Sequence, residues 1–368
     1  MDTTNLPNSF DTVVVGAGPA GVMAALHAAE RGSVLLTDAS RLPRDKSCGG
    51  MLNEYTQGFL SEFGTLPPEM ALEPNWVNFR YHDWDRGIRK PTALRFANVD
   101  RSSFDDWLVG LLPGNVTVIG NSQLTGFNED SEGVRATLRT GGGNGDGDGV
   151  DRTVSCENLI GCDGPRSTVR RALGVGSVAT YVTLQDFCTI EGEIEPYFDC
   201  IYMRHIGDSF AYAYVVPKGD VAIVGAVFYP KTKRPYEKHE EALQTLRQAL
   251  PLGESVKREA WVALSVRHAR DVVPGRGRVL LAGEAGGFMS PTSGEGISYA
   301  LNTGRLAGIA VGRHDPARAL GAYAEATSAI ASNITRKLKW LPFMESRTGK
   351  YLAGFVPTPV VSHVTKGL

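Results

Sequence analysis

The sequence has few of the features that mark exported, membrane-spanning or metal-binding proteins. Its five cysteines form an odd set without a C-x-x-C pair, which argues against a zinc ribbon or disulfide framework and favours a reducing compartment. No apolar run approaches the roughly 18 residues that a membrane-spanning helix needs, and the longest, such as 221–229, are strand-sized. The N-terminus lacks the basic and apolar regions of a signal peptide. We therefore expect a soluble, cytoplasmic protein without a metal site.

The overall charge favours no charged partner. The chain carries 38 basic and 40 acidic side chains, a formal net charge of −2, so it lacks an overall electrostatic footprint for nucleic acid or an anionic membrane. Its 368 residues suffice for two or three domains. What the sequence does have is glycine, with 43 residues, or about 12% against a usual share of roughly 7%.

The clearest local pattern lies near the N-terminus. Residues 12–15 form a continuous apolar run typical of a strand buried on both faces, and the hexapeptide GAGPAG (residues 16–21) follows at once. An alanine-rich stretch with a proline in its first turn then predicts a helix that reaches Gly32. A second short strand, residues 34–37, ends at Asp38.

This strand, glycine turn and helix predict a dinucleotide-binding unit. Gly16 allows the tight turn, Gly18 lets a pyrophosphate approach the backbone, and Gly21 lets the helix pack closely on the strand. The N-terminus of the helix favours the bound anion. Asp38, which lies 22 positions after the first glycine, is placed to accept hydrogen bonds from a ribose.

The next part of the chain mixes strands with one helix. Residues 76–96 are aromatic and charged without helical periodicity, and 100–108 predict an amphipathic helix with Ser102 or Ser103 as its N-cap. We expect the glycine-rich segment 141–149 to be a hairpin loop without a functional role, because its glycines lie among acidic residues and no helix follows. Alternation predicts further strands at 116–119 and 134–138.

The pattern in the C-terminal half predicts a change of architecture, followed by a return to the strand-and-helix pattern of the N-terminal unit. Residues 177–263 predict strands with aromatic alternation and one helix near 238–250. A buried strand at 278–283 and a helix at 296–313 then resume the first pattern, and an amphipathic helix is expected near 317–341. The dinucleotide-binding unit is therefore interrupted by an inserted one.

Several segments carry a resemblance to a known family. LIGCDGPRSTVR (159–170), GEAGG (283–287) and PTSGEGI (291–297), together with Asp100-Arg101 and Phe104-Asp105, resemble FAD-dependent oxidoreductases of the aromatic-hydroxylase type over Phe10 to Val311. Within that superfamily, RDKSCGG (44–50) and the P-x-x-G-E-G-I ending are most similar to the geranylgeranyl reductase family.

The patterns along the chain, together with the resemblance, predict an α/β fold with three parts. A discontinuous, Rossmann-like FAD-binding domain would comprise residues 1–75, 97–176 and 264–315. An inserted α+β substrate domain, mainly an antiparallel sheet, would comprise 76–96 and 177–263. Residues 316–368 would form a short C-terminal helical segment.

The resemblance also implies positions around FAD. Asp163-Gly164 and Arg101 are expected near the pyrophosphate, and Glu284, which replaces the family's usual Asp, near sugar-alcohol hydroxyls. The loop before the helix at 296–313 would direct the positive end of the helix dipole at flavin N1 and O2. The full expected cofactor-binding set is Gly16, Ala17, Gly18, Pro19, Ala20, Gly21, Asp38, Ala39, Cys48, Gly49, Gly50, Arg101, Leu124, Asp163, Gly164, Gly283, Glu284, Pro291, Gly294, Glu295, Gly296 and Ile297.

Cys48 and Tyr214 are the candidate catalytic residues. Cys48 resembles the cysteine that the reductase family places against the isoalloxazine ring, and Arg44 and Lys46 would lower its pKa if they are close in space. A buried thiol that only packs is the alternative, and the other four cysteines are expected to be inert. Tyr214 stands where the family has Trp, which changes the substrate cavity wall; it is a candidate hydrogen-bond or proton donor, with core packing as the alternative.

The expected function is reduction of carbon–carbon double bonds in an isoprenoid or similar apolar substrate, by hydride from flavin N5. The alternative is an FAD-dependent monooxygenase, a hydroxylase or halogenase acting on a small aromatic substrate, although the W-x-W-x-I-P motif of flavin halogenases is absent. A non-catalytic electron-transfer flavoprotein fits less well, because the sequence has no cysteine cluster for an iron–sulfur centre. NAD(P)H and a ferredoxin-like protein both remain open as electron donors. We expect no nucleic-acid partner and leave open a peripheral membrane contact that would reach a lipid substrate.

Overall fold

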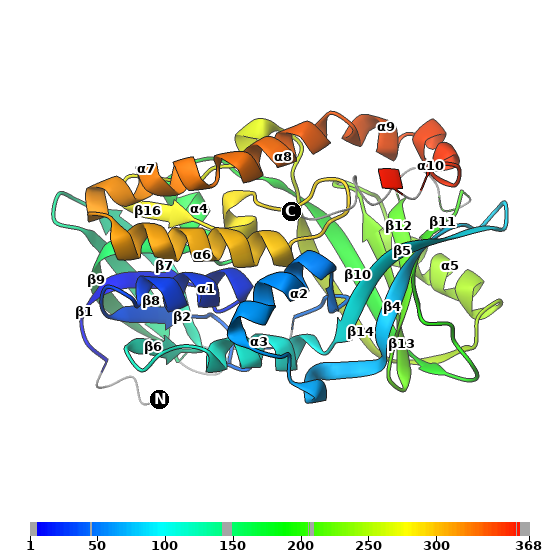
Figure 1. Cartoon of the computed structure of the whole chain (residues 1–368), viewed down its shortest axis with the longest axis horizontal. Coiled ribbons are helices and arrows are strands. Elements are labelled where there is room, and N and C mark those ends of the chain that lie inside the picture. Colours follow the sequence, from blue (N-terminus) through cyan, green and yellow to red (C-terminus); the bar gives the residue numbers. More distant parts are fainter. Residues whose placement is uncertain are drawn as a thin grey trace.

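The computed structural model describes residues 6–44, 46–141, 149–204, 206, 210–357 and 359–360. The glycine-rich segment 141–149 lies mostly outside these residues, so its expected loop has no structural account. The described chain forms two eight-stranded sheets side by side, with helices on the first and a helical C-terminal segment running across both (Figure 1). This arrangement confirms the predicted α/β fold, with a Rossmann-like unit and an inserted, largely antiparallel one.

The first sheet is built around the N-terminal strand. Its core strands β16, β9, β1, β2 and β6 run parallel, β15 pairs antiparallel with β16, and the hairpin β7–β8 pairs antiparallel with β9. The apolar run that predicted β1 has no exposed residue, because helices or strands cover both faces. The strands are, in sheet order, β15 (Gly275–Arg276), β16 (Val279–Leu281), β9 (Val150–Gly161), β1 (Ser9–Val15), β2 (Val34–Thr37) and β6 (Val116–Ile119), with β7 (Ser122–Glu129) and β8 (Val134–Thr140).

Two helices, α1 (Pro19–Ala28) and α6 (Ile297–Arg313), pack against each other on this sheet (Figure 1). Their axes approach closely because α6 carries glycine at the contact: a Cβ at Gly304 would lie 2.1 Å from the carbonyl oxygen of Ala20. Helix α1 ends at Ala28, four residues before the predicted Gly32. The contact brings the N-termini of both helices to the same edge of the sheet.

Helices α3 (Arg101–Gly110) and α4 (Thr168–Leu173) complete the first unit. The N-cap of α3 is Asp100, whose carboxylate accepts the N–H of Ser103 at 2.8 Å, and not Ser102 or Ser103 as expected. Asp is an equally strong N-cap, and with Asp100 in that position Ser103 becomes the third helical residue. Among the described residues, 3-10 turns occur at Ser61–Phe63, Pro68–Met70, Ala269–Asp271 and Gly283–Gly286.

The second sheet is mainly antiparallel and carries the inserted unit. The first hairpin of this sheet runs from Ala71 to Val99, so it extends a few residues beyond the expected 76–96 at each end. Its strands are, in sheet order, β14 (Leu252–Ser265), β10 (Ala179–Ile190), β13 (Val221–Phe228), β12 (Phe210–Lys218), β11 (Tyr197–Tyr202), β4 (Ala71–Asp83), β5 (Ile88–Val99) and β3 (Met51–Leu52). Helix α5 (Pro235–Arg247) packs on β10, β13 and β14, and α2 (Glu54–Leu60) lies between the two units.

The C-terminal segment bridges the two units (Figure 1). The single amphipathic helix expected near 317–341 is divided at Thr327 into α7 (Pro316–Ala326) and α8 (Ser328–Leu338), and α9 (Leu341–Glu345) and α10 (Arg347–Ala353) follow. Helix α10 is held on the second sheet by the Tyr81 hydroxyl, which donates to the carbonyl of Lys350 at 2.8 Å. Within the described ranges, no helix is long and apolar enough to cross a bilayer.

A buried ion pair lies at a parallel contact of the otherwise antiparallel second sheet, between β4 and β11, as far as the described residues show. Arg80 and Asp199 are register partners there, each only 7% exposed, and the guanidinium donates to both carboxylate oxygens at 2.6 and 2.8 Å. Removing one partner of such a pair leaves an uncompensated buried charge.

We expect Arg80→Met to lower the free energy of unfolding by about 3–5 kcal/mol, because it leaves the Asp199 carboxylate buried in the sheet without its cationic partner. Urea denaturation checks this. The matched control is Arg139→Met, which breaks an equally well-formed but solvent-exposed pair with Asp151 and should cost much less. Equal losses in the two variants would contradict the account.

Candidate cofactor and active site

One cavity of about 980 Å³ connects the edge of the first sheet with the second sheet and the C-terminal segment. It brings together both candidate catalytic residues and all but two of the expected cofactor-binding residues. The two exceptions are Ala17 and Gly21, which lie just behind the wall. The expected residues that line the cavity are Gly16, Gly18, Pro19, Ala20, Asp38, Ala39, Cys48, Gly49, Gly50, Arg101, Leu124, Asp163, Gly164, Tyr214, Gly283, Glu284, Pro291, Gly294, Glu295, Gly296 and Ile297.

The glycine turn between β1 and α1 leaves little room for a side chain at the positions where the sequence analysis expected glycine to be required. Gly16 has φ +101°, and a Cβ at Gly21 would lie 1.7 Å from the carbonyl oxygen of Gly16. A Cβ at Gly18 would lie 2.4 Å from the Arg44 guanidinium, so this cation covers the exposed backbone at the start of α1. The result is a bare backbone cradle with a helix N-terminus and a cation beside it, which fits a pyrophosphate.

Asp38 ties the end of β2 to this turn. Its carboxylate accepts the N–H groups of Ala17 and Ser40, each at 2.8 Å, and lies 3.9 Å from the Arg44 guanidinium. Each carboxylate oxygen has room for a further hydrogen bond. Asp38 is therefore fixed at the cavity wall, with acceptor capacity left for a ribose hydroxyl.

A chain of charged side chains leads from Asp38 toward the second sheet. Arg44 donates to Asp105 at 3.0 Å, and Asp105 in turn receives a bidentate bond from Arg101, with its shortest contact at 2.8 Å. Arg101, expected near the pyrophosphate, is only 7% exposed and lines the cavity at the end of this chain. The Nε of Arg44 is buried without a hydrogen-bond partner among the described residues, which leaves one donor for an anion.

Cys48 lies at the end of the charge chain. Burial by itself raises the pKa of this thiol, but the Arg101 guanidinium, the Gly50 N–H and the Lys46 ammonium outweigh burial and hold the pKa below its ordinary value. The Gly50 N–H donates to Sγ at 3.5 Å. Of the two cations expected to act on the thiol, Lys46 does so, while Arg44 pairs with Asp105 and Arg101 takes its place.

The loop that carries Cys48 is fastened by a lysine that the sequence analysis did not single out. Lys218, at the end of β12, is 6% exposed and donates to the carbonyls of Gly50 and Val99, both at 3.1 Å. Burial lowers its pKa to about 8, while the Cys48 charge opposes that shift. The signal available in the sequence was a lysine at the end of an apolar strand, four positions after Tyr214.

Tyr214 faces the same region from β12. Its hydroxyl accepts a hydrogen bond from Gln185, whose carbonyl oxygen accepts one from Ser47, the residue before Cys48. Burial raises the pKa of the phenol, so Tyr214 stays protonated. Gly225 on the adjacent strand makes room for the ring, because a Cβ there would lie 2.1 Å from it. Gln185, also missed from the sequence, thus connects the two candidate catalytic residues.

Glu284 and Asp163 line the cavity but also have structural partners. Glu284 accepts the Leu264 N–H at 3.0 Å and lies 3.5 Å from the Lys46 ammonium, so it joins the two units. Asp163 accepts the N–H groups of Thr168 and Val169 at the start of α4, and burial raises its pKa. Both carboxylates therefore position the backbone around the expected cofactor.

The loop before α6 ends the cavity on the first unit's side. Gly294 has φ +69°, and the Glu295 carboxylate accepts the Ser298 N–H at 2.8 Å, which satisfies one of the free N–H groups in the first turn of α6. Burial raises the pKa of Glu295, an effect that Lys337 of α8 opposes. Lys337 also lies 3.3 Å from the Tyr299 hydroxyl and 3.5 Å from Ser290, so the C-terminal segment supports this loop from behind.

The far end of the cavity is apolar and aromatic. The Phe198 ring lies 5.6 Å from Phe79, 6.2 Å from Phe96 and 5.8 Å from Tyr214, in each case at a steep angle. All four rings line the cavity, and the remaining wall comes from the second sheet and from α9 and α10. A glycine-lined, charged end and an aromatic end thus meet at Cys48.

Comparisons with known proteins agree with this geometry. The FAD binding domain family matches residues 111–336. Protein CbrA of Escherichia coli O9:H4 (strain HS) is 27% identical over 340 residues, 89% of this chain and 88% of that protein.

Two solved structures share the fold across nearly the whole chain. A geranylgeranyl bacteriochlorophyll reductase-like protein from Thermoplasma acidophilum superposes with a TM-score of 0.70 over 98% of this chain and 92% of that one, at 20% identity. The flavin-dependent brominase Bmp2 superposes with a TM-score of 0.74 over 97% and 93%, at 17% identity. At such identities the likeness shows the fold alone.

We expect Gly21→Ala to weaken FAD binding by at least about tenfold, equivalent to about 1.4 kcal/mol, because the added Cβ would collide with the Gly16 carbonyl and push α1 from the turn. Flavin absorbance after dialysis, or a fluorescence titration with FAD, measures this. Gly58→Ala in α2 is the control, since nothing lies within 4 Å of its Cβ position. Wild-type affinity in Gly21→Ala would contradict the assignment of the cradle.

Proposed function

The chain belongs to the FAD binding domain family, and from this premise we propose that it is an FAD-dependent reductase that saturates carbon–carbon double bonds of an isoprenoid or similar apolar substrate. The glycine cradle, Asp38 and the N-terminus of α6 would hold the cofactor in the charged end of the cavity. The aromatic end would hold the substrate, with Cys48 and Tyr214 at the junction.

The observation that carries the proposal is the placement of the Cys48 thiol. It lies on the wall of the cavity where the two ends meet, and Arg101 and the Gly50 N–H stabilise its thiolate. A thiol that only packs would need no such support, and the pKa of the buried Cys162 thiol is raised by burial. The RDKSCGG segment and the fold of the Thermoplasma reductase-like protein point the same way.

Reduction of an alkene requires one hydride and one proton. Bound reduced FAD would supply the hydride from N5. Cys48 would give its proton to the other alkene carbon, and Arg101 and the Gly50 N–H would stabilise the thiolate that results. A lowered pKa suits a group that gives up its proton during the reaction and regains it afterwards. Solvent then returns the proton to Cys48.

Tyr214 and Lys218 would position the reacting groups. Tyr214, kept protonated by burial, is connected through Gln185 to the Cys48 loop and forms part of the aromatic wall. Lys218 holds Gly50 in its left-handed conformation, φ +59°, and so fixes the backbone next to the thiol. The aromatic rings exclude water and favour an apolar substrate over a charged one.

The alternative function is a monooxygenase acting on a small aromatic substrate. The fold shared with the brominase Bmp2 favours it, and an aromatic chamber would also accept an aromatic ring. The monooxygenase alternative assigns no role to the Cys48 thiol, whose thiolate form Arg101 and the Gly50 N–H stabilise. Reactivity toward oxygen separates the two functions.

We expect anaerobically reduced enzyme to be reoxidised by a polyprenyl alcohol, and Cys48→Ala to keep its FAD but react at least about 10²-fold more slowly, the range lost with a general acid. Stopped-flow absorbance of the flavin, after reduction with dithionite, measures both rates. Cys188→Ala is the matched control, because this cysteine is buried in β10 and does not line the cavity.

Two results would overturn these assignments. If Cys48→Ala reacted as fast as the wild type, the thiol would not be the acid. If polyprenyl compounds left the reduced flavin unchanged and an oxygenated aromatic product formed in air, the monooxygenase alternative would hold.

A further inference from the structure

The apolar side chains that the structure exposes are concentrated on the C-terminal segment. Of the twelve large apolar side chains exposed among the described residues, six lie within residues 340–360. Single exposed apolar residues need no explanation, but a cluster marks an interaction surface. The six are Trp340 (60% exposed), Phe343 (46%), Tyr351 (45%), Leu352 (39%), Phe355 (59%) and Val360 (48%).

The same segment is positively charged. Residues 328–360 contain five basic side chains and one acidic one, and three of the five basic side chains are exposed, since Lys337 and Lys350 are buried. The acidic residue, Glu345, is paired with Arg267 at 2.6 Å. Arg336, Lys339 and Arg347 are exposed beside the apolar cluster. Apolar and basic side chains on short helices are typical of segments that lie in an anionic membrane interface.

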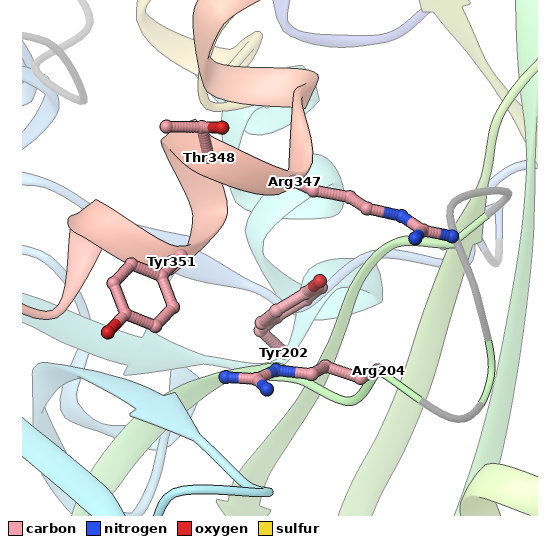
Figure 2. A pocket seen from close by; sticks show the side chains of 5 residues that line it. All are labelled: Tyr202, Arg204, Arg347, Thr348 and Tyr351. Carbon is pink, nitrogen blue, oxygen red and sulfur yellow. The ribbon is translucent and has the colours of Figure 1, made fainter.

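A hollow of about 440 Å³ adjoins this cluster. Figure 2 shows α10 contributing Arg347, Thr348 and Tyr351 from one side, and Tyr202 at the end of β11 with Arg204 just beyond it from the other. The guanidinium of Arg204 lies 5.8 Å from the Tyr351 ring; that of Arg86, which is paired with Asp83 at 3.2 Å, lies 3.9 Å from the same ring and supports it as a structural contact. Guanidinium groups beside hydroxyls suit a phosphate, and tyrosines suit the level of lipid headgroups.

The cluster lies where the apolar cavity meets the surface. Trp340, Phe343 and Val360 line the cavity and are themselves exposed, and Tyr202 lines both the cavity and the hollow. A ligand that left the aromatic chamber on this side would pass directly between exposed apolar and basic residues.

We propose that the surface formed by residues 336–360 and Arg204 docks on a bilayer that contains anionic phospholipid, so that the cavity opens toward the membrane. The apolar residues would enter the interface and the basic ones would contact lipid phosphates. That the cavity receives an apolar substrate from the bilayer rests on the proposed function; the docking itself does not.

Sedimentation with vesicles tests the docking without any turnover. The holoenzyme should bind vesicles of phosphatidylcholine mixed with phosphatidylglycerol, bind phosphatidylcholine vesicles much less, and lose binding as salt rises. Arg336→Gln with Lys339→Gln should weaken vesicle binding about 30-fold, since each basic residue near an anionic surface contributes about fivefold to the affinity. Leu352→Ser with Phe355→Ser should weaken it as well. None of these four residues lines the cavity.

Matched controls are Lys231→Gln with Lys233→Gln, and Tyr236→Ser with Val256→Ser, which change exposed residues outside this surface and should leave vesicle binding unaltered. Flavin absorbance shows that each variant is folded.

The proposal is overturned if the holoenzyme does not bind anionic vesicles, or if controls and test variants lose binding equally. A concentration-dependent dimer that the test variants abolish, without vesicle binding, would assign the surface to a second copy instead. An enzyme inactive on every alkene yet bound to vesicles would refute the proposed function and not the docking.

Discussion

The site depends on one buried cation, the guanidinium of Arg101. A buried charge is tolerated only when it is paired and hydrogen-bonded, and Arg101 obtains this from the bidentate contact with Asp105 and from the Cys48 thiol. Asp105 also takes Arg44, which lies over the glycine turn. The dinucleotide cradle, helix α3 and the Cys48 loop are thereby held in one electrostatic unit. The same cation that joins the two halves of the cavity stabilises the thiolate at their junction, so its structural and proposed chemical roles cannot be separated.

Sequence reasoning located the parts of this site that rest on local rules. The β1–glycine–α1–β2 unit follows from apolar periodicity and from positions that admit no Cβ, and Gly16, Gly21 and Asp38 lie where those rules require. The fold class followed for the same reason, because each buried strand and each long helix carries its own pattern. Resemblance to a family then brought in Cys48, Arg101 and the 291–297 loop, which local rules alone do not connect.

What the sequence did not reveal were pairings between residues far apart in the chain. Nothing in the pattern around Gln185 or Lys218 indicates that one would bind Tyr214 and the other the Gly50 carbonyl, since both contacts depend on how the sheets meet. Arg44 was expected to act on Cys48 because it is near in sequence, yet it pairs with Asp105, 61 positions away. Chain-wide charge was similarly uninformative, because the −2 total conceals a C-terminal segment with an excess of basic residues, three of them exposed.

The central claim is that the cavity joins reduced flavin to an apolar alkene with a protein thiol as the proton source. Mass spectrometry of products formed in D₂O, with and without oxygen-18 gas, tests it most directly. The account predicts a saturated product that contains no added oxygen atom, forms equally well under anaerobic conditions, and carries at least one solvent deuterium for each double bond reduced. Incorporation of oxygen-18 into the product, together with no product formed when oxygen is absent, would contradict the account.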